Sequence, residues 1–245
     1  VKLELNIDGV LGSLQFHPTN SDLVAFSIST PNFPSDVFSL DLSGMPKKNG
    51  HVTPTRWSES EKGEIPDESV LSPSVVRIPS FDSLSFSFFY YPPTSSSSSS
   101  PLKKHPVMIN IHGGPASQFR PSFSPIFHFY VHELQIVLIC PNVRGSTGYG
   151  KKFMKADDCY LRENSVKDIG VILDWIDQQE DLDSSNVMVS GGSYGGFMVL
   201  ASLIKFGNRL KCGVERVGIT NWVTFLENTS DYRRDHRRQE YGDER

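Results

Sequence analysis

Four short runs of branched apolar residues, separated by stretches with a helical pattern, constrain the fold of this chain more than any other feature. The runs cover residues 107–111, 136–140, 187–190 and 214–219. Runs of this length and composition are typical of parallel strands that are covered on both faces. Because helices must connect and cover such strands, the pattern predicts a doubly wound α/β domain with a mostly parallel sheet.

Two helices are predicted between and after these strands. The first begins near Ser165, which together with Asp168 resembles a capping box, and its apolar residues recur at the spacing of one helical face. These residues are Ile169, Ile172, Leu173 and Ile176. The second helix begins after Ser193 and ends at Gly207, a residue type that commonly stops helices. Its expected apolar face consists of Phe197, Leu200, Ala201 and Ile204.

The first 59 residues show another pattern, in which short alternating runs are separated by turn residues. The runs at 11–16, 22–29, 36–42 and 51–57 predict four antiparallel strands, which would form one blade of a β-propeller. We expect residues 1–7 to belong to a preceding blade. Because a lone blade cannot bury both faces, the chain is expected to be incomplete at its N-terminal end. The alternative is an extra sheet packed on the main domain.

The composition changes twice after this region. Residues 60–75 are polar and acidic with two prolines, which is typical of a linker, and a run of serines at 94–101 predicts a disordered loop between two strands. We therefore divide the chain into a terminal propeller blade at 1–59, a linker at 60–75 and an α/β domain at 76–245.

Composition argues against several kinds of partner. A formal net charge of −4 over 245 residues is not the basic balance that favours nucleic acid. The longest apolar runs are strand-sized, far below the roughly 20 residues of a membrane span. Three widely spaced cysteines imply neither a disulfide framework nor a metal site, so we expect no metal or cofactor. The three cysteines favour a reducing compartment, and the cytoplasm is the default unless a targeting peptide is missing. The sequence leaves open whether the protein forms a homo-oligomer.

One motif carries chemistry directly. Residues 191–195 read Gly-Gly-Ser-Tyr-Gly, which fits G-x-S-x-G and lies between a predicted strand and a predicted helix. In this context a sharp turn strains the serine backbone and exposes its hydroxyl, and small neighbours such as Gly191 and Gly195 permit the turn. Ser193 is the predicted nucleophile, and the Tyr194 amide is a predicted oxyanion donor. The alternative is a glycine-rich packing turn.

A second glycine motif follows the first buried strand. Residues 112–115 read His-Gly-Gly-Pro, at the location expected for the other oxyanion donor of such a site. Gly114 is our predicted donor, because Pro115 has no amide hydrogen. A plain Gly-Pro turn is the alternative, and we expect His112 to be structural and not a base.

These two motifs, together with Pro-Asn-Val-Arg-Gly-Ser-Thr-Gly-Tyr-Gly at residues 141–150, resemble the prolyl oligopeptidase family, and in particular its acylaminoacyl-peptidase-like branch. The resemblance covers essentially the whole chain. It implies an α/β-hydrolase domain preceded by a β-propeller, and a serine peptidase that acts on short peptides through an acyl-enzyme. Some relatives use a tyrosine hydroxyl at the oxyanion. No tyrosine occurs at residues 110–112 of this chain, so the resemblance favours the Gly114 amide as the second oxyanion donor.

The base and the acid of a serine triad are not evident. In this fold both follow the serine in the chain, and the only later histidine is His236. It lies in a stretch of alternating charge that predicts a solvated helix face. We therefore expect the α/β-hydrolase domain to be incomplete at its C-terminal end, with the acid and the histidine beyond Arg245 and this chain alone inactive. A carboxylesterase and a non-catalytic fragment or binding module are the alternatives.

Overall fold

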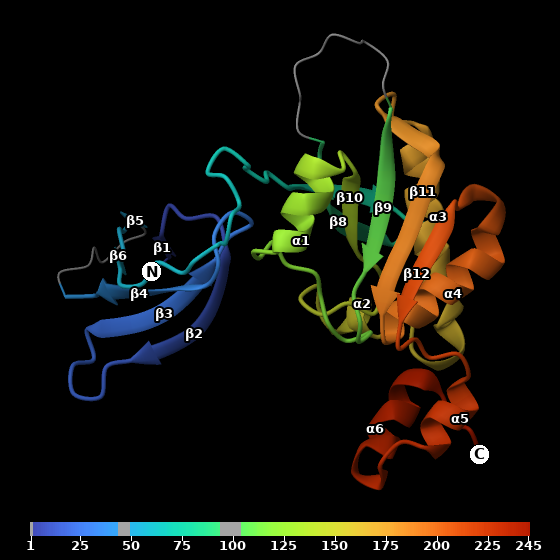
Figure 1. Cartoon of the computed structure of the whole chain (residues 1–245). Coiled ribbons are helices and arrows are strands. Elements are labelled where there is room, and N and C mark those ends of the chain that lie inside the picture. The colour runs from blue at the N-terminus through green and yellow to red at the C-terminus, as the bar shows by residue number, and fades with distance from the viewer. Residues whose placement is uncertain (1, 44–49, 94–103) are drawn as a thin grey trace. The chain divides into compact units, whose positions relative to one another are not determined.

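A computed structural model of the chain describes residues 2–43, 50–93 and 104–245 (Figure 1). Internal contacts divide the chain into two compact units. The first unit runs to Pro73 and includes residues 120–129, and the second consists of residues 74–119 and 130–245. The predicted serine-rich loop at 94–101 lies outside the described residues. The domain boundaries derived from the sequence stay predictions.

The first unit contains a four-stranded antiparallel sheet and a two-stranded parallel sheet. The larger sheet has the order β2 (Val10–Phe16), β3 (Leu23–Ser29), β4 (Asp36–Asp41) and β6 (Thr55–Arg56), and the smaller one pairs β1 (Leu3–Glu4) with β5 (Gly50–His51). The unit also includes the short helix α1 (Pro125–His128). Alternate residues of β3, namely Val24, Phe26 and Ile28, are buried, as the alternation predicts. The propeller interpretation of this unit stays a prediction.

The predicted single strand at 51–57 is wrong. The structure breaks it into β5, which pairs with β1, and β6, which pairs with β4. Pro54 lies in the break, and a proline has no amide hydrogen for a strand ladder. The fourth strand of the sheet is consequently reduced to Thr55 and Arg56.

The second unit is built on a six-stranded sheet whose order is β12-β11-β9-β10-β8-β7. The strands are β7 (Ser74–Pro79), β8 (Ser85–Tyr91), β9 (His105–Ile111), β10 (Val137–Asn142), β11 (Leu182–Gly192) and β12 (Cys212–Arg216). The last four strands pair in parallel, whereas β8 pairs antiparallel with both β10 and β7. The mostly parallel sheet predicted from the apolar runs is therefore confirmed, with an antiparallel hairpin at one edge.

Helices lie between these strands and after the last of them. They are η1 (Phe129–Glu133), α2 (Lys151–Met154), η2 (Cys159–Leu161), α3 (Glu163–Asp177), α4 (Tyr194–Phe206), η3 (Gly207–Arg209), α5 (Trp222–Glu227) and α6 (Asp231–Tyr241). The two long helices α3 and α4 lie side by side and pack on β11 (Figure 1). Among the described residues, no helix has the length and apolar character that a membrane crossing requires.

The core of the second unit lies between the sheet and these helices. All six residues of β10 are buried, as expected for a strand covered on both faces. The four α3 residues predicted to line one helical face are fully or almost fully buried. Trp175 of α3 packs edge-on against Phe88 of β8 with ring centroids 5.0 Å apart. The sequence pattern thus places α3 correctly against the sheet.

Three local predictions in this unit are wrong. Helix α3 begins at Glu163, two residues before Ser165, whose hydroxyl donates to the Arg162 carbonyl oxygen at 2.7 Å, so Ser165 is not a cap. Helix α4 buries Met198, Val199 and Ser202, whereas Ile204 of the predicted apolar face is 88% exposed. The last strand ends at Arg216 and not at residue 219, because the following residue has a positive φ of 47°.

Candidate active site

The backbone of Ser193 is strained in the way the motif predicts. Ser193 lies between the end of β11 and the start of α4, with φ 56° and ψ −120°, a conformation that residues with a side chain rarely adopt. Its amide donates to the Arg216 carbonyl oxygen at 2.9 Å, and its carbonyl oxygen accepts from the Gly196 amide at 2.9 Å. These bonds hold the turn, and the Ser193 residue is exposed at its tip.

Glycines on both sides of Ser193 permit the turn. A Cβ atom at Gly191 would lie 2.5 Å from the Gly195 carbonyl oxygen and 2.9 Å from that of Ile111. A Cβ atom at Gly195 would overlap the Ile111 carbonyl oxygen and lie 3.0 Å from that of His112. Only glycine fits at these two positions without moving the backbone of β9.

The His-Gly-Gly-Pro loop lies beside this turn. The parallel pairing of β9 with β11 aligns Ile111 with Gly191, so the residues that follow each strand meet at the same edge of the sheet. A Cβ atom at Gly113 would lie only 3.5 Å from the Ser193 Cβ. Gly114 has a positive φ of 138°, which favours glycine. The structure thus brings the loop that contains Gly114 next to Ser193.

Both ring nitrogens of His112 have hydrogen-bond partners within the protein. Its Nδ1 lies 2.7 Å from the Gly113 carbonyl oxygen, and its Nε2 lies 2.9 Å from the Ser146 hydroxyl. Burial lowers the pKa of its ring. Both nitrogens are therefore engaged, Nδ1 within the loop itself and Nε2 with the segment after β10, which supports the structural role expected from the sequence.

Tyr194 is the first residue of α4, and its side chain is completely buried. An amide at this position has no acceptor within its own helix and lies at the positive end of the helix dipole. The phenol oxygen lies 2.8 Å from the Ser165 hydroxyl and donates to Asp157 Oδ2 at 3.1 Å. Asp157 also accepts from Arg162, and burial raises the pKa of its carboxyl to about 7. The start of α4 is thereby fixed to the segment before α3.

A buried arginine holds the segment after β10. Arg144, whose side chain is 2% exposed, donates from Nη2 to Asp168 Oδ1 at 2.8 Å and from Nη1 to Asp82 Oδ2 at 2.8 Å. The Arg144 backbone amide donates to Asp168 Oδ2 at 3.0 Å, and Arg144 Nη2 also donates to Ser80 Oγ at 3.1 Å. These contacts tie the 141–150 motif to α3 and to the β7–β8 turn. The sequence marks Arg144 within a motif but does not identify its partners.

His236 lies on α6 and is exposed, as the charge pattern predicts. The neighbouring arginines are paired with acidic residues on or near the same helix, for example Arg238 with Asp235 at 2.9 Å and Arg237 with Glu240 at 2.7 Å. In the part of the chain that the structure describes, no hydrogen bond joins the Ser193 hydroxyl to a histidine. Within the described residues, the structure therefore shows no histidine bonded to the Ser193 hydroxyl.

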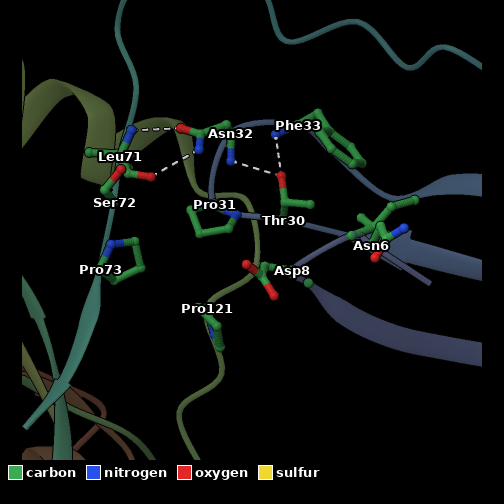
Figure 2. Close-up of a pocket in the computed structure, with 12 residues that line it drawn as sticks. Asn6, Asp8, Thr30, Pro31, Asn32, Phe33, Leu71, Ser72, Pro73 and Pro121 are labelled. Carbon is green, nitrogen blue, oxygen red and sulfur yellow. Dashed lines mark hydrogen bonds between the residues drawn. The ribbon is translucent and has the colours of Figure 1, made fainter. Parts of the chain in front are cut away.

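The first unit contains a cavity of about 770 Å³, which Figure 2 shows. On one side, the Asn32 side chain donates to the Leu71 carbonyl oxygen at 2.9 Å and accepts from the Leu71 amide at 2.6 Å. Thr30 Oγ1 accepts from the amides of Asn32 and Phe33, each at 3.1 Å. The described residues around this cavity include no histidine, cysteine or lysine. The Asn32 and Thr30 side chains at this cavity hold loops together.

The parallel sheet, the covering helices and the strained serine between β11 and α4 define an α/β-hydrolase fold with a nucleophile elbow. The model of the prolyl oligopeptidase family matches residues 121–245, which is just over half of the chain. The chain belongs to this family.

Curated relatives match almost the whole chain at low identity. The acylamino-acid-releasing enzyme of Homo sapiens is 26% identical over 232 residues, which cover 92% of this chain and 30% of that protein. The uncharacterized peptidase YuxL of Bacillus subtilis is 26% identical over 225 residues, which cover 88% of this chain and 31% of that protein. The chain thus spans about a third of the length of these relatives.

Solved structures show the same fold. A puromycin-hydrolyzing peptidase of Mycobacterium tuberculosis superimposes with a TM-score of 0.78 at 20% identity, over 90% of this chain and 33% of that chain. An acylaminoacyl peptidase of Pyrococcus horikoshii superimposes with a TM-score of 0.75 at 20% identity, over 91% of this chain and 34% of that chain. The predicted α/β-hydrolase fold is confirmed.

Proposed function

We propose that the full-length protein is a serine peptidase and that Ser193 is its nucleophile. The observation that carries the proposal is the strained, exposed Ser193 at the end of β11, next to a glycine loop and at the N-terminus of α4. A backbone of this kind is costly, and such conformations cluster at active sites. Membership of the prolyl oligopeptidase family supports the same reaction class.

In this proposal the Ser193 oxygen attacks the carbonyl carbon of a peptide bond while a general base takes its proton. The carbonyl oxygen becomes negative, and the amides of Tyr194 and Gly114 stabilise it. The carbon–nitrogen bond then breaks, the amine leaves with the proton, and the acyl group stays on Ser193. Water, activated by the same base, hydrolyses this ester and frees the serine. The base is expected to be a histidine that follows Arg245, preceded by its acid.

Short peptides are the proposed substrates. Human and bacterial relatives are named as an acylamino-acid-releasing enzyme and a peptidase, which supports an oligopeptidase or acylaminoacyl-peptidase activity. The first unit, interpreted as part of a propeller, would restrict entry to short chains. Ester hydrolysis requires only the elbow and the donors, so a carboxylesterase is the main alternative.

Paired substrates separate these two activities. We expect the full-length protein to cleave acetylated and free aminoacyl 4-nitroanilides and short peptides, because the site is proposed to act on amide bonds. Turnover should be measured on these amides and on nitrophenyl acyl esters with matched acyl groups, with Ser193→Ala as the blank. Hydrolysis of the esters with no turnover of any amide would contradict the peptidase assignment and favour the esterase.

A further inference from the structure

The side chain of Tyr241 reaches from the end of α6 to the glycine loop beside Ser193. Its hydroxyl donates to the Gly114 carbonyl oxygen at 2.7 Å, a contact between residues 127 positions apart. The Tyr241 side chain is largely buried, and burial raises the pKa of its phenol, so the hydroxyl stays a donor. The bond is therefore a fixed link between α6 and Gly114.

Gly114 needs such a link. Its φ of 138° lies in a region that favours glycine, and glycine has more backbone freedom than any other residue. The next residue, Pro115, has no amide hydrogen with which to anchor the loop. A hydrogen bond to the Gly114 carbonyl oxygen restrains rotation about this residue and with it the direction of its own amide.

The ring of Tyr241 is itself held by aromatic and cationic neighbours. It stacks on Trp222 of α5 with ring centroids 4.4 Å apart and meets Phe225 edge-on at 5.5 Å. The Arg162 guanidinium carbon lies 5.0 Å from the Tyr241 ring centroid and 5.2 Å from that of Tyr194. Arg162 also donates to the Glu240 carbonyl oxygen and to Asp157, the acceptor of the Tyr194 hydroxyl.

These contacts form one connected group that touches both proposed oxyanion donors. On one side Tyr194 is held through its hydroxyl and its ring, and on the other side Gly114 is held through its carbonyl oxygen. Two donors stabilise an oxyanion only when both are held at hydrogen-bond distance from the same point in space. A group that fixes both at once therefore fixes their separation.

We propose that Tyr241 is a positioning residue for the oxyanion site, which sets the orientation of Gly114 through the hydroxyl–carbonyl hydrogen bond and couples it to Tyr194 through Arg162. The inference rests on the proposed function, since it assumes that these two amides act on the substrate carbonyl. It adds a role for α6, an element that contributes no reacting group.

Tyr241→Phe in the full-length protein tests this role, because it keeps the ring and removes only the hydroxyl. We expect kcat for a peptide nitroanilide to fall about 10- to 100-fold with KM within about twofold, since a misplaced donor weakens the transition state more than substrate binding. The Ki of a peptide aldehyde, whose adduct with Ser193 places an oxygen at the donors, should rise by a similar factor. Tyr232→Phe, an 85% exposed tyrosine on the same helix, is the matched control and should change neither value.

The outcomes separate the inference from the function on which it rests. No Ser193-dependent turnover by the wild-type protein would mean that the proposed function is wrong, and the inference would fall with it. Normal wild-type turnover with kcat and aldehyde Ki unchanged in Tyr241→Phe would overturn the inference alone. A Tyr241→Phe protein that melts below the assay temperature would assign the hydroxyl to folding and would overturn it as well.

Discussion

Replacing Ser193 with alanine is expected to reduce peptide hydrolysis by the full-length protein by about 10⁴-fold or more, since loss of a serine nucleophile removes the whole acyl-enzyme route. The substitution removes one oxygen atom at an exposed position. Alanine at φ 56° is strained in the same way as serine, so the fold should not change. Steady-state hydrolysis of a peptide nitroanilide and a thermal melt measure the two effects.

Ser190→Ala is the matched control for this variant. Ser190 lies on β11, three residues before Ser193, and pairs in the sheet with Asn110 and Val214. Replacing Ser190 should leave kcat/KM within about twofold of the wild-type value, because the Ser190 hydroxyl is not at the elbow. Peptide turnover by Ser193→Ala at a rate near that of the wild type would show that another residue forms the acyl-enzyme.

Arg144→Met is expected to lower the free energy of unfolding by about 3–5 kcal/mol, the usual cost of removing one partner from a buried ion pair. The substitution leaves the Asp168 carboxylate, which is 0% exposed, with the Ser80 hydroxyl as its remaining side-chain partner. It also frees Asp82, whose pKa the hydrogen bond from Arg144 lowers. Urea denaturation followed by circular dichroism measures the loss.

Arg209→Met provides the comparison, because Arg209 also pairs with two aspartates. Its Nη1 lies 2.7 Å from Asp174 Oδ1 and its Nη2 lies 2.7 Å from Asp177 Oδ2, but those two side chains are 64% and 52% exposed. Exposed pairs contribute only about 0–1 kcal/mol, so this variant should be nearly as stable as the wild type. Equal stability losses in the two variants would contradict the structural role assigned to Arg144.

The elbow could be predicted from the sequence because its sequence signal is local. The strand before Ser193, the helix after it and the small residues Gly191 and Gly195 all lie within a few positions, although the close neighbour that requires glycine at 195 is the distant Ile111 carbonyl oxygen. The parallel strands were predictable for a similar reason, since burial on both faces leaves a continuous apolar run. The parallel sheet and the strained turn at Ser193 thus follow from short-range patterns.

Other features depend on partners that are distant in the sequence. Ser165 looks like a helix cap, but its hydroxyl bonds to the Arg162 carbonyl oxygen and to Tyr194, 29 positions later. The apolar pattern of α4 predicts its buried face only in part, because Phe197 and Ala201 pack against the core but the fully buried positions include the polar Ser202. The links from Arg144 to Asp82 and from Tyr241 to Gly114 have no sequence signature at all.

The most direct test of the central claim is labelling with a fluorophosphonate, which reacts with an activated serine and phosphonylates its oxygen. We expect the full-length wild-type protein to be labelled stoichiometrically, with the added mass mapped by peptide sequencing to Ser193, and Ser193→Ala to stay unlabelled. Absence of labelling on Ser193, under conditions that mark a known serine hydrolase in the same tube, would contradict the assignment of Ser193 as the nucleophile.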